Sequence, residues 1–240
     1  MKPPAISIDT IKDGRTSQRA SAYLTKEIFL GRLEPGQRLG IGKLTSLSGM
    51  AAATIREALA GLVGRGLVRV SGSRAFYVAD LNELDFHDLM HTRFLLEGVA
   101  LRDSILNGGS EWESEVATAL ARLDTCSSGA GKTTDDSILN FISLHKAFHQ
   151  ALISASRLTR VLAYIDAIYD QYSRYEIQQA PSTGHGSCLL DSHDIDGHRR
   201  LSDAAMARDL EAASEELRMH LFSQPPTSGT APNGASSPLA

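Results

Sequence analysis

The sequence is poor in cysteine and has no long apolar run. Its 240 residues include two cysteines, Cys126 and Cys188, at no spacing typical of a metal or redox motif. We therefore expect reduced thiols and a cytoplasmic protein. No apolar stretch approaches about 18 residues, which excludes a membrane-spanning helix. Residues 1–15 lack the apolar core of a signal peptide and are expected to form a flexible tail.

The net charge of −4 is distributed unevenly along the chain. Residues 16–79 contain nine lysines and arginines against three acidic residues, whereas residues 81–223 contain 12 basic and 22 acidic residues. A basic amino-terminal part joined to an acidic part is typical of a nucleic-acid-binding domain linked to a second domain. Chance segregation of solvated charges is the alternative. The chain length also favours two domains.

The basic part contains two predicted helices with a tight turn between them. Apolar residues at helical spacing predict a helix over residues 51–63 and a shorter helix that begins at Ile41. The segment 48–50 contains a glycine and predicts the turn. Arg56 lies one position from the apolar stripe of the longer helix, so its side chain should face solvent.

Two short strands are predicted after these helices. Residues 67–70 and 75–78 have β-forming sequences on either side of a turn at 71–74. Helix, turn, helix and hairpin in this order indicate a winged helix-turn-helix over residues 16–80. Such a domain would place the longer helix in the major groove of DNA and the wing near the DNA backbone.

Three motifs in this part resemble the DNA-binding domain of GntR-type bacterial regulators. They are GRLEPGQRL at 31–39, IREAL at 55–59 and GLV at 66–68. The resemblance implies that Arg56 contacts DNA, while a surface ion pair with an acid such as Glu57 or Glu34 is the alternative. The family has Ser-Arg at the start of the recognition helix, where this chain has two alanines, so other residues should carry more of the contact. The predicted DNA-binding residues are Arg38, Lys43, Ala52, Thr54, Arg56 and Arg74.

Residues 81–223 are predicted to form six helices and no strand. A segment rich in proline, serine and glycine follows at 224–240, and we expect it to be disordered. The predicted fold is therefore mainly α, with an amino-terminal winged helix-turn-helix and a carboxy-terminal all-α six-helix bundle. Apolar periodicity places the six helices at 84–106, 112–123, 135–154, 158–178, 189–207 and 209–222.

Four histidines interrupt the apolar stripes of these helices. His145 and His149 are four residues apart on one helix, so both imidazoles lie on the same face. His198 and His220 each lie on the inward face of a later helix. A divalent metal ion, such as zinc or nickel, would satisfy several buried ring nitrogens at once. Hydrogen bonds from each ring to a backbone carbonyl are the alternative.

The helical part is similar to the FCD effector-binding domain, which follows this DNA-binding domain in the FadR subgroup. The similarity rests on RFLLE at 93–97 and on the positions of the last three histidines. It implies a metal site formed by His149, His198 and His220, with a fourth ligand at His145, where the family usually has aspartate.

Arg93 is a candidate effector-binding residue. In the family, the equivalent arginine can hold an effector carboxylate through a planar two-pronged contact. A salt bridge to Glu97 on the same helix is the alternative. His87 and His91, near the start of that helix, are expected at the surface or between the domains.

The resemblance implies a DNA-binding transcriptional regulator that represses a catabolic operon. We expect a homodimer on a roughly palindromic operator, because two-fold protein symmetry calls for two-fold DNA symmetry. A small organic acid bound at the metal site would modulate operator binding. The alternative is a metal-dependent hydrolase or lyase with a three-histidine site. The sequence has no His-Glu-x-x-His motif, so we predict no enzymatic activity.

Overall fold

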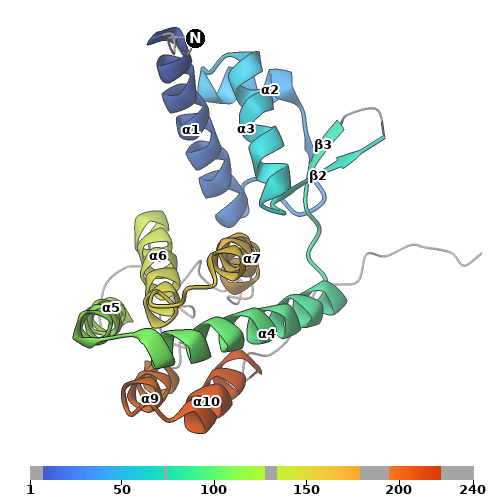
Figure 1. The fold of residues 1–240 in the computed structure, drawn as a ribbon. Coiled ribbons are helices and arrows are strands. Elements are labelled where there is room, and N and C mark those ends of the chain that lie inside the picture. Colours follow the sequence, from blue (N-terminus) through green and yellow to red (C-terminus); the bar gives the residue numbers. More distant parts are fainter. Residues whose placement is uncertain (1–7, 73–74, 128–133, 179–194, 223–240) are drawn as a thin grey trace, which may run out of the picture.

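The computed structural model describes residues 8–72, 75–127, 134–178 and 195–222 (Figure 1). Within these ranges the chain is mainly helical, with an amino-terminal winged helix-turn-helix, the head, and a carboxy-terminal helical body. This confirms the predicted fold class. The predictions for Arg74, for Cys188 and for the tail at 224–240 lie outside the described residues.

The head consists of helices and a small antiparallel sheet. The sheet has the strand order β1-β3-β2, with Leu39 opposite Phe76 and Val68 opposite Val78. β1 was not predicted, because a strand of two residues has too few positions to show a period. The elements of the head are α1 (Ile8–Phe29), β1 (Arg38–Leu39), α2 (Ile41–Ser48), α3 (Ala52–Gly64), β2 (Val68–Ser71) and β3 (Ala75–Val78).

α1 begins earlier than the sequence indicated. The sequence predicted a flexible tail over residues 1–15, but residues 8–15 are helical. The later part of α1 is anchored by buried Ala20, Leu24 and Ile28. Once this packed part has formed, additional turns need only propagation, which costs much less than nucleation.

The turn between α2 and α3 orients the predicted recognition helix. Gly49 ends α2 with a φ of 69°, a left-handed conformation that favours glycine. Ile55, Leu59 and Leu62 are fully buried on one side of α3. Arg56 is exposed, as its position beside the apolar stripe predicted.

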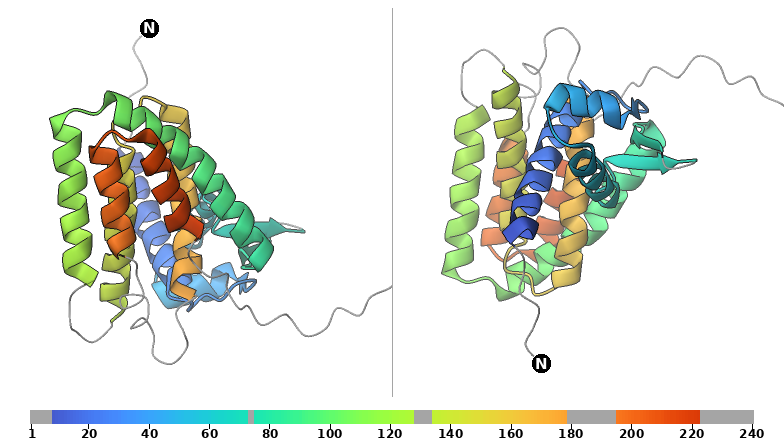
Figure 2. Two further views of the ribbon diagram at one scale, coloured as in Figure 1. Left: turned by 90° about the horizontal axis from the view of Figure 1, so that it is seen from below. Right: turned by 90° about the horizontal axis from the view of Figure 1, so that it is seen from above.

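All six predicted body helices are present in the described part of the chain, although residues 189–194 of the fifth lie outside it. α6 and α7 lie on the side of the body nearest the head, and α9 and α10 pack on the other side of α4 (Figures 1 and 2). None of the described helices is long and apolar enough to cross a membrane. The body helices are α4 (Glu83–Asn107), α5 (Ser110–Ser127), α6 (Asp135–Leu152), α7 (Thr159–Gln178), α9 (Ile195–Met206) and α10 (Leu210–Phe222).

Polar contacts join the head to α6 and α7. Arg65, directly after α3, donates from Nε to Asp170 Oδ2 of α7 at 2.7 Å and from a terminal nitrogen to Thr25 Oγ1 of α1 at 3.2 Å. Lys146 of α6 donates to the other oxygen of Asp170 at 3.2 Å. Arg174 of α7 donates to the backbone carbonyl of Ala79. The head is therefore held by the same two helices that carry several residues of the site described next.

Candidate functional site

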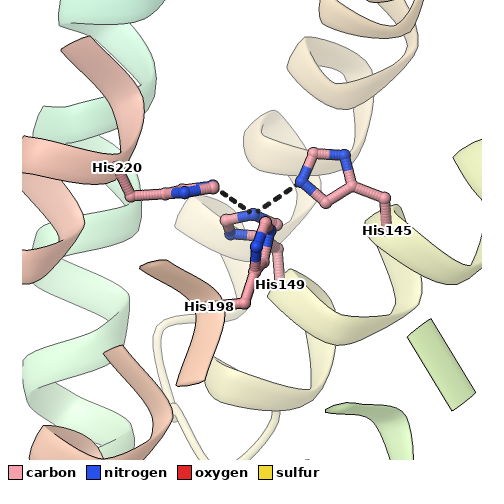
Figure 3. Close-up of side chains that lie close together, drawn as sticks. All are labelled: His145, His149, His198 and His220. Carbon is pink, nitrogen blue, oxygen red and sulfur yellow. Dashed lines mark hydrogen bonds between the residues drawn. The ribbon is translucent and has the colours of Figure 1, made fainter. Parts of the chain in front are cut away.

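The four predicted histidines meet inside the body. His145 and His149 come from α6, His198 from α9 and His220 from α10, and one ring nitrogen of each lies within 4.8 Å of the others (Figure 3). His149 Nε2 lies 3.1 Å from His145 Nε2 and 3.2 Å from His220 Nε2. All four side chains are buried. Residues separated by up to 75 positions thus form one cluster.

Glu97, which is buried, and Glu176, which is partly buried, lie behind two of these rings. His145 Nδ1 lies 2.8 Å from Glu176 Oε1 of α7, and His149 Nδ1 lies 3.3 Å from Glu97 Oε2 of α4. A carboxylate accepts a hydrogen bond, so it favours the tautomer with the proton on Nδ1. The lone pair of each Nε2 then points to the centre of the cluster, which is the arrangement that a metal-ligating histidine requires.

Burial keeps the imidazoles of His145 and His220 neutral. Burial, together with the nearby charge of Arg93, lowers the pKa of His145 to about 3, although Glu97 partly opposes the shift. Burial, together with the other three histidines, also lowers the pKa of His220 well below its ordinary value. Neutral imidazole is the form that binds metal ions.

Two of the distances between the ring nitrogens fit a divalent transition metal ion. A zinc–nitrogen distance of about 2.0–2.1 Å places two ligand nitrogens roughly 2.9–3.4 Å apart, depending on the coordination angle. The distances of 3.1 and 3.2 Å between Nε2 atoms fall in this range. An all-imidazole donor set suits zinc, nickel, copper or iron, whereas magnesium and calcium prefer oxygen ligands.

Arg93 lies next to this cluster and is almost completely buried. Its Nε donates to Glu97 Oε1 at 2.5 Å, so the salt bridge considered from the sequence is present. Its guanidinium carbon lies 4.8 Å from the ring centre of Tyr169 and 4.3 Å from that of Tyr172. Although burial acts to lower the pKa of Arg93, the charge of Glu97 and the two tyrosines raise it above its ordinary value.

The two terminal nitrogens of Arg93 have unused hydrogen-bonding capacity. They are buried, and they lie within electrostatic reach of the hydroxyls of Tyr169 and Tyr172. Neither nitrogen has a partner at hydrogen-bonding geometry. Buried charged donors without partners cost free energy, so this side of Arg93 is suited to receive an anionic ligand.

Sequence reasoning missed three residues of this site. Tyr169, Tyr172 and Glu176 lie at steps of three and four residues on α7, so they occupy one face of that helix. This spacing could have indicated a polar inward face. The sequence could not show that this face lies against Arg93 and His145.

The predicted DNA-binding residues are spread over three elements of the head. Ala52 and Arg56 line one shallow hollow on the outer side of α3, and Thr54 is half-buried on the same helix. Lys43 on α2 and Arg38 on β1 are exposed. The ion pairs described within the head join Arg32 to Glu27 and Arg69 to Asp80, and none of them involves Arg56.

Comparisons with known protein families match both parts of the chain. Residues 16–78 match the bacterial regulatory proteins of the gntR family, and residues 88–223 match the FCD domain. The chain is 37% identical to an uncharacterized HTH-type transcriptional regulator, BphR, of Paraburkholderia xenovorans, over 83% of this chain and 80% of that protein. It is 31% identical to the HTH-type transcriptional repressor GlaR of Escherichia coli, over 88% of this chain and 94% of that protein.

Solved structures have the same fold. Escherichia coli McbR/YncC has a TM-score of 0.67 at 20% identity, over 86% of this chain and 93% of that one. A GntR regulator from a Rhodococcus species has a TM-score of 0.65 at 21% identity, over 85% of this chain and 93% of that one. At these identities the likeness supports the arrangement of the helices but does not identify a ligand.

Proposed function

The chain belongs to the GntR family of bacterial regulatory proteins and has an FCD domain, and we propose that it represses a catabolic operon until a small organic acid binds at a metal centre. It is a DNA-binding transcriptional regulator, and its relatives are regulators rather than enzymes. GlaR, which is named as a repressor, supports the proposed sign of regulation. We further propose a homodimer that acts in the cytoplasm, where a bacterial regulator meets its operator.

The observation that carries the metal centre is the orientation of His145 and His149. Glu176 Oε1 lies 2.8 Å from His145 Nδ1 and Glu97 Oε2 lies 3.3 Å from His149 Nδ1, so both carboxylates favour a proton on Nδ1. With the protons on Nδ1, the two Nε2 lone pairs would face each other at 3.1 Å. Neutral imidazoles in this tautomer cannot donate to each other, and a pKa of about 3 keeps His145 from taking up a proton. A bound cation would convert this repulsion into two favourable bonds.

Arg93 would hold the carboxylate of the effector beside the metal ion. Glu97 connects the two parts, because one of its oxygens lies near His149 and the other accepts from Arg93. The bound metal ion supplies a Lewis-acid anchor for an oxygen of the organic acid. The terminal nitrogens of Arg93, held between Tyr169 and Tyr172, can donate two parallel hydrogen bonds to a carboxylate.

Effector binding would reach the head through α6 and α7. α6 carries His145 and His149 toward the cluster and Lys146 toward Asp170, which accepts from Arg65 of the head. A ligand changes the position of the heads only if it binds two arrangements with different affinity. The short path through α6 and α7 gives the ligand a physical route to create that difference.

Metal analysis of the purified protein tests this proposal. Wild type should contain a divalent transition metal near one ion per chain, and its operator affinity should change when small carboxylic acids are added but not when the matching alcohols are added. The double variant His149→Ala/His198→Ala should lose the metal and the response to acids. Operator binding itself should remain, because the head is not altered.

His87→Ala is the matched control. His87 is about half exposed on α4 and lies near Glu83 rather than in the cluster. It should keep the metal and the response to acids. An unchanged metal content in the double variant would show that the site is assigned wrongly. The alternative of a metal-dependent hydrolase or lyase finds no support in the comparisons.

A further inference from the structure

One side of α4 has an apolar stripe that the described chain leaves uncovered. Leu84, Leu95, Val99 and Leu106 are 82%, 65%, 53% and 64% exposed, whereas the opposite side of α4 is buried in the body. Figure 2 shows α4 along one edge of the body, with no described element packed on one of its sides. An apolar stripe of this length on a surface helix is typical of an interaction site.

The stripe also contains three polar residues and follows a regular period. Its seven positions are separated by steps of 4, 3, 4, 4, 3 and 4 residues. All seven therefore lie within about 80° around the helix and extend over roughly 33 Å of its length. Gly98 lies beside the stripe, and no heavy atom lies within 4 Å of the position that its Cβ would take. The stripe consists of Leu84, Asp88, His91, Leu95, Val99, Arg102 and Leu106.

We propose that the occupant of this stripe is a second copy of the chain, with the two α4 helices antiparallel and the two-fold axis at Leu95. In this register each residue meets its counterpart in the other copy at an equal distance from the axis. Leucine then meets leucine at both ends and at the centre, and acid meets base in between. The pairs are Leu84 with Leu106, Asp88 with Arg102, His91 with Val99, and Leu95 with Leu95.

The charges on the stripe support this occupant over an unrelated partner. A two-fold interface must be self-complementary, because each copy presents the same surface. Asp88 and Arg102 lie seven residues on either side of Leu95, so the two copies would form two reciprocal ion pairs around a leucine centre. This inference rests on the proposed homodimer and adds its surface and register.

Charge reversal at the two positions tests the register. The variants Asp88→Arg and Arg102→Asp each place like charges opposite each other twice, so each should raise the Kd of the dimer roughly tenfold or more. An equimolar mixture of the two variants restores both ion pairs and should dimerise like wild type. The double variant in one chain should do the same. Sedimentation velocity at a series of concentrations measures each Kd.

The mixture is decisive because Arg102 also borders Asp209, directly before α10, and Glu211 and Glu215 of α10. A purely local effect of Arg102→Asp would persist in the mixture and would overturn the proposed register. Leu95→Arg gives a second measurement, because it brings two positive charges to the axis and should also raise the Kd by roughly tenfold or more. Tyr164→Arg, 66% exposed on α7, is the matched control and should leave the dimer intact.

Operator binding and metal content of the same samples separate the two proposals. If every α4 variant dimerises with the Kd of wild type, the α4 interface is wrong, but the proposed function as a regulator is not affected. A wild-type monomer would overturn the interface and the homodimer together. A chain that binds neither metal nor operator would overturn the proposed function, while sedimentation would still decide whether α4 pairs with itself.

Discussion

Arg93 and Glu97 form an ion pair that has almost no contact with solvent. Their side chains are 0% and 2% exposed, and both lie beside the histidine cluster. Charges are costly to bury, and a pair is tolerated only where each partner compensates the other. Arg93 therefore has two roles, because it compensates the buried charge of Glu97 and is also the residue proposed to hold the effector.

Removing one partner of this pair should be strongly destabilising. Arg93→Met leaves the Glu97 carboxylate buried without its cation, and we expect the free energy of unfolding to fall by about 3–5 kcal/mol. Urea denaturation followed by circular dichroism measures the change. Arg218→Ala, which breaks an exposed pair with Glu215, should lower the free energy of unfolding far less, because solvent screens the pair. Equal losses in the two variants would contradict the assigned role of burial.

Arg56 is the exposed basic residue of α3 on which DNA binding is proposed to depend. Arg56→Ala should weaken operator binding by about 1–3 kcal/mol if the side chain reads a base. If it contacts a phosphate, binding should weaken almost equally on all sequences, and the slope of log K against log salt should become shallower by about one. Fluorescence anisotropy at several salt concentrations distinguishes the two.

The control for Arg56 is an exposed arginine in the body. Arg160 on α7 is exposed, and Arg160→Ala should leave the operator affinity and its salt dependence unchanged. An equal loss in both variants would indicate a general effect of net charge. In that case Arg56 would have no specific role.

At the scale of the elements, the junction between α3 and β2 depends on Gly66. Its φ of 71° lies in the left-handed region, and an added Cβ would lie 2.6 Å from the side chain of Gln171 on α7. The same short segment thus turns the chain after the recognition helix and brings the head close to the body. Arg65, its neighbour, makes the contact with Asp170.

Two glycine substitutions should have opposite effects. Gly66→Ala should destabilise the protein by about 1–2 kcal/mol, because alanine is strained in the left-handed region. Gly61→Ala lies inside α3 with no heavy atom within 4 Å of its new Cβ, and it should stabilise by about 0.5–1 kcal/mol. Thermal unfolding of both variants and of wild type shows whether each substitution raises or lowers the stability. A lower stability of Gly61→Ala would mean that a contact outside α3 restricts this position.

At the scale of the whole molecule, Asp170 connects the head to the helical body. It accepts from Arg65 of the head and from Lys146 of α6, and its side chain is only 9% exposed. A conformational signal that starts at His145 or His149 has to pass only along α6 to Lys146 before it meets this contact. The basic head and the acidic body are thus held together by charges of opposite sign.

Asp170→Asn should loosen the head without altering the proposed metal centre. The amide keeps the shape of the side chain but loses the charge that attracts Arg65 and Lys146. We expect faster hydrogen exchange over residues 64–67, measured by mass spectrometry, with unchanged metal content. Asp166→Asn is the matched control, because Asp166 also pairs with Lys146 but is 58% exposed and lacks the bond to Arg65. Identical exchange in both variants would exclude Asp170 as the connection.

The sequence by itself determined the body helices, the helix-turn-helix with its hairpin, and the inward position of His145, His149, His198 and His220. These features depend on local patterns, such as the spacing of Ile55, Leu59 and Leu62 or of His145 and His149. Local patterns are visible because a helix brings residues three and four apart to one face, whatever surrounds it. The resemblance of the motifs to a known family then indicated what the two parts do.

Only the tertiary structure decided which of these faces meet. It placed His198 and His220 beside His149, as the resemblance had implied, set Glu176 behind His145, and left the terminal nitrogens of Arg93 without a hydrogen-bond partner while Arg93 pairs with Glu97. It also placed Asp170 against the head and left one side of α4 uncovered. Such contacts join residues far apart in the chain, and they depend on how whole helices pack, which no local period records.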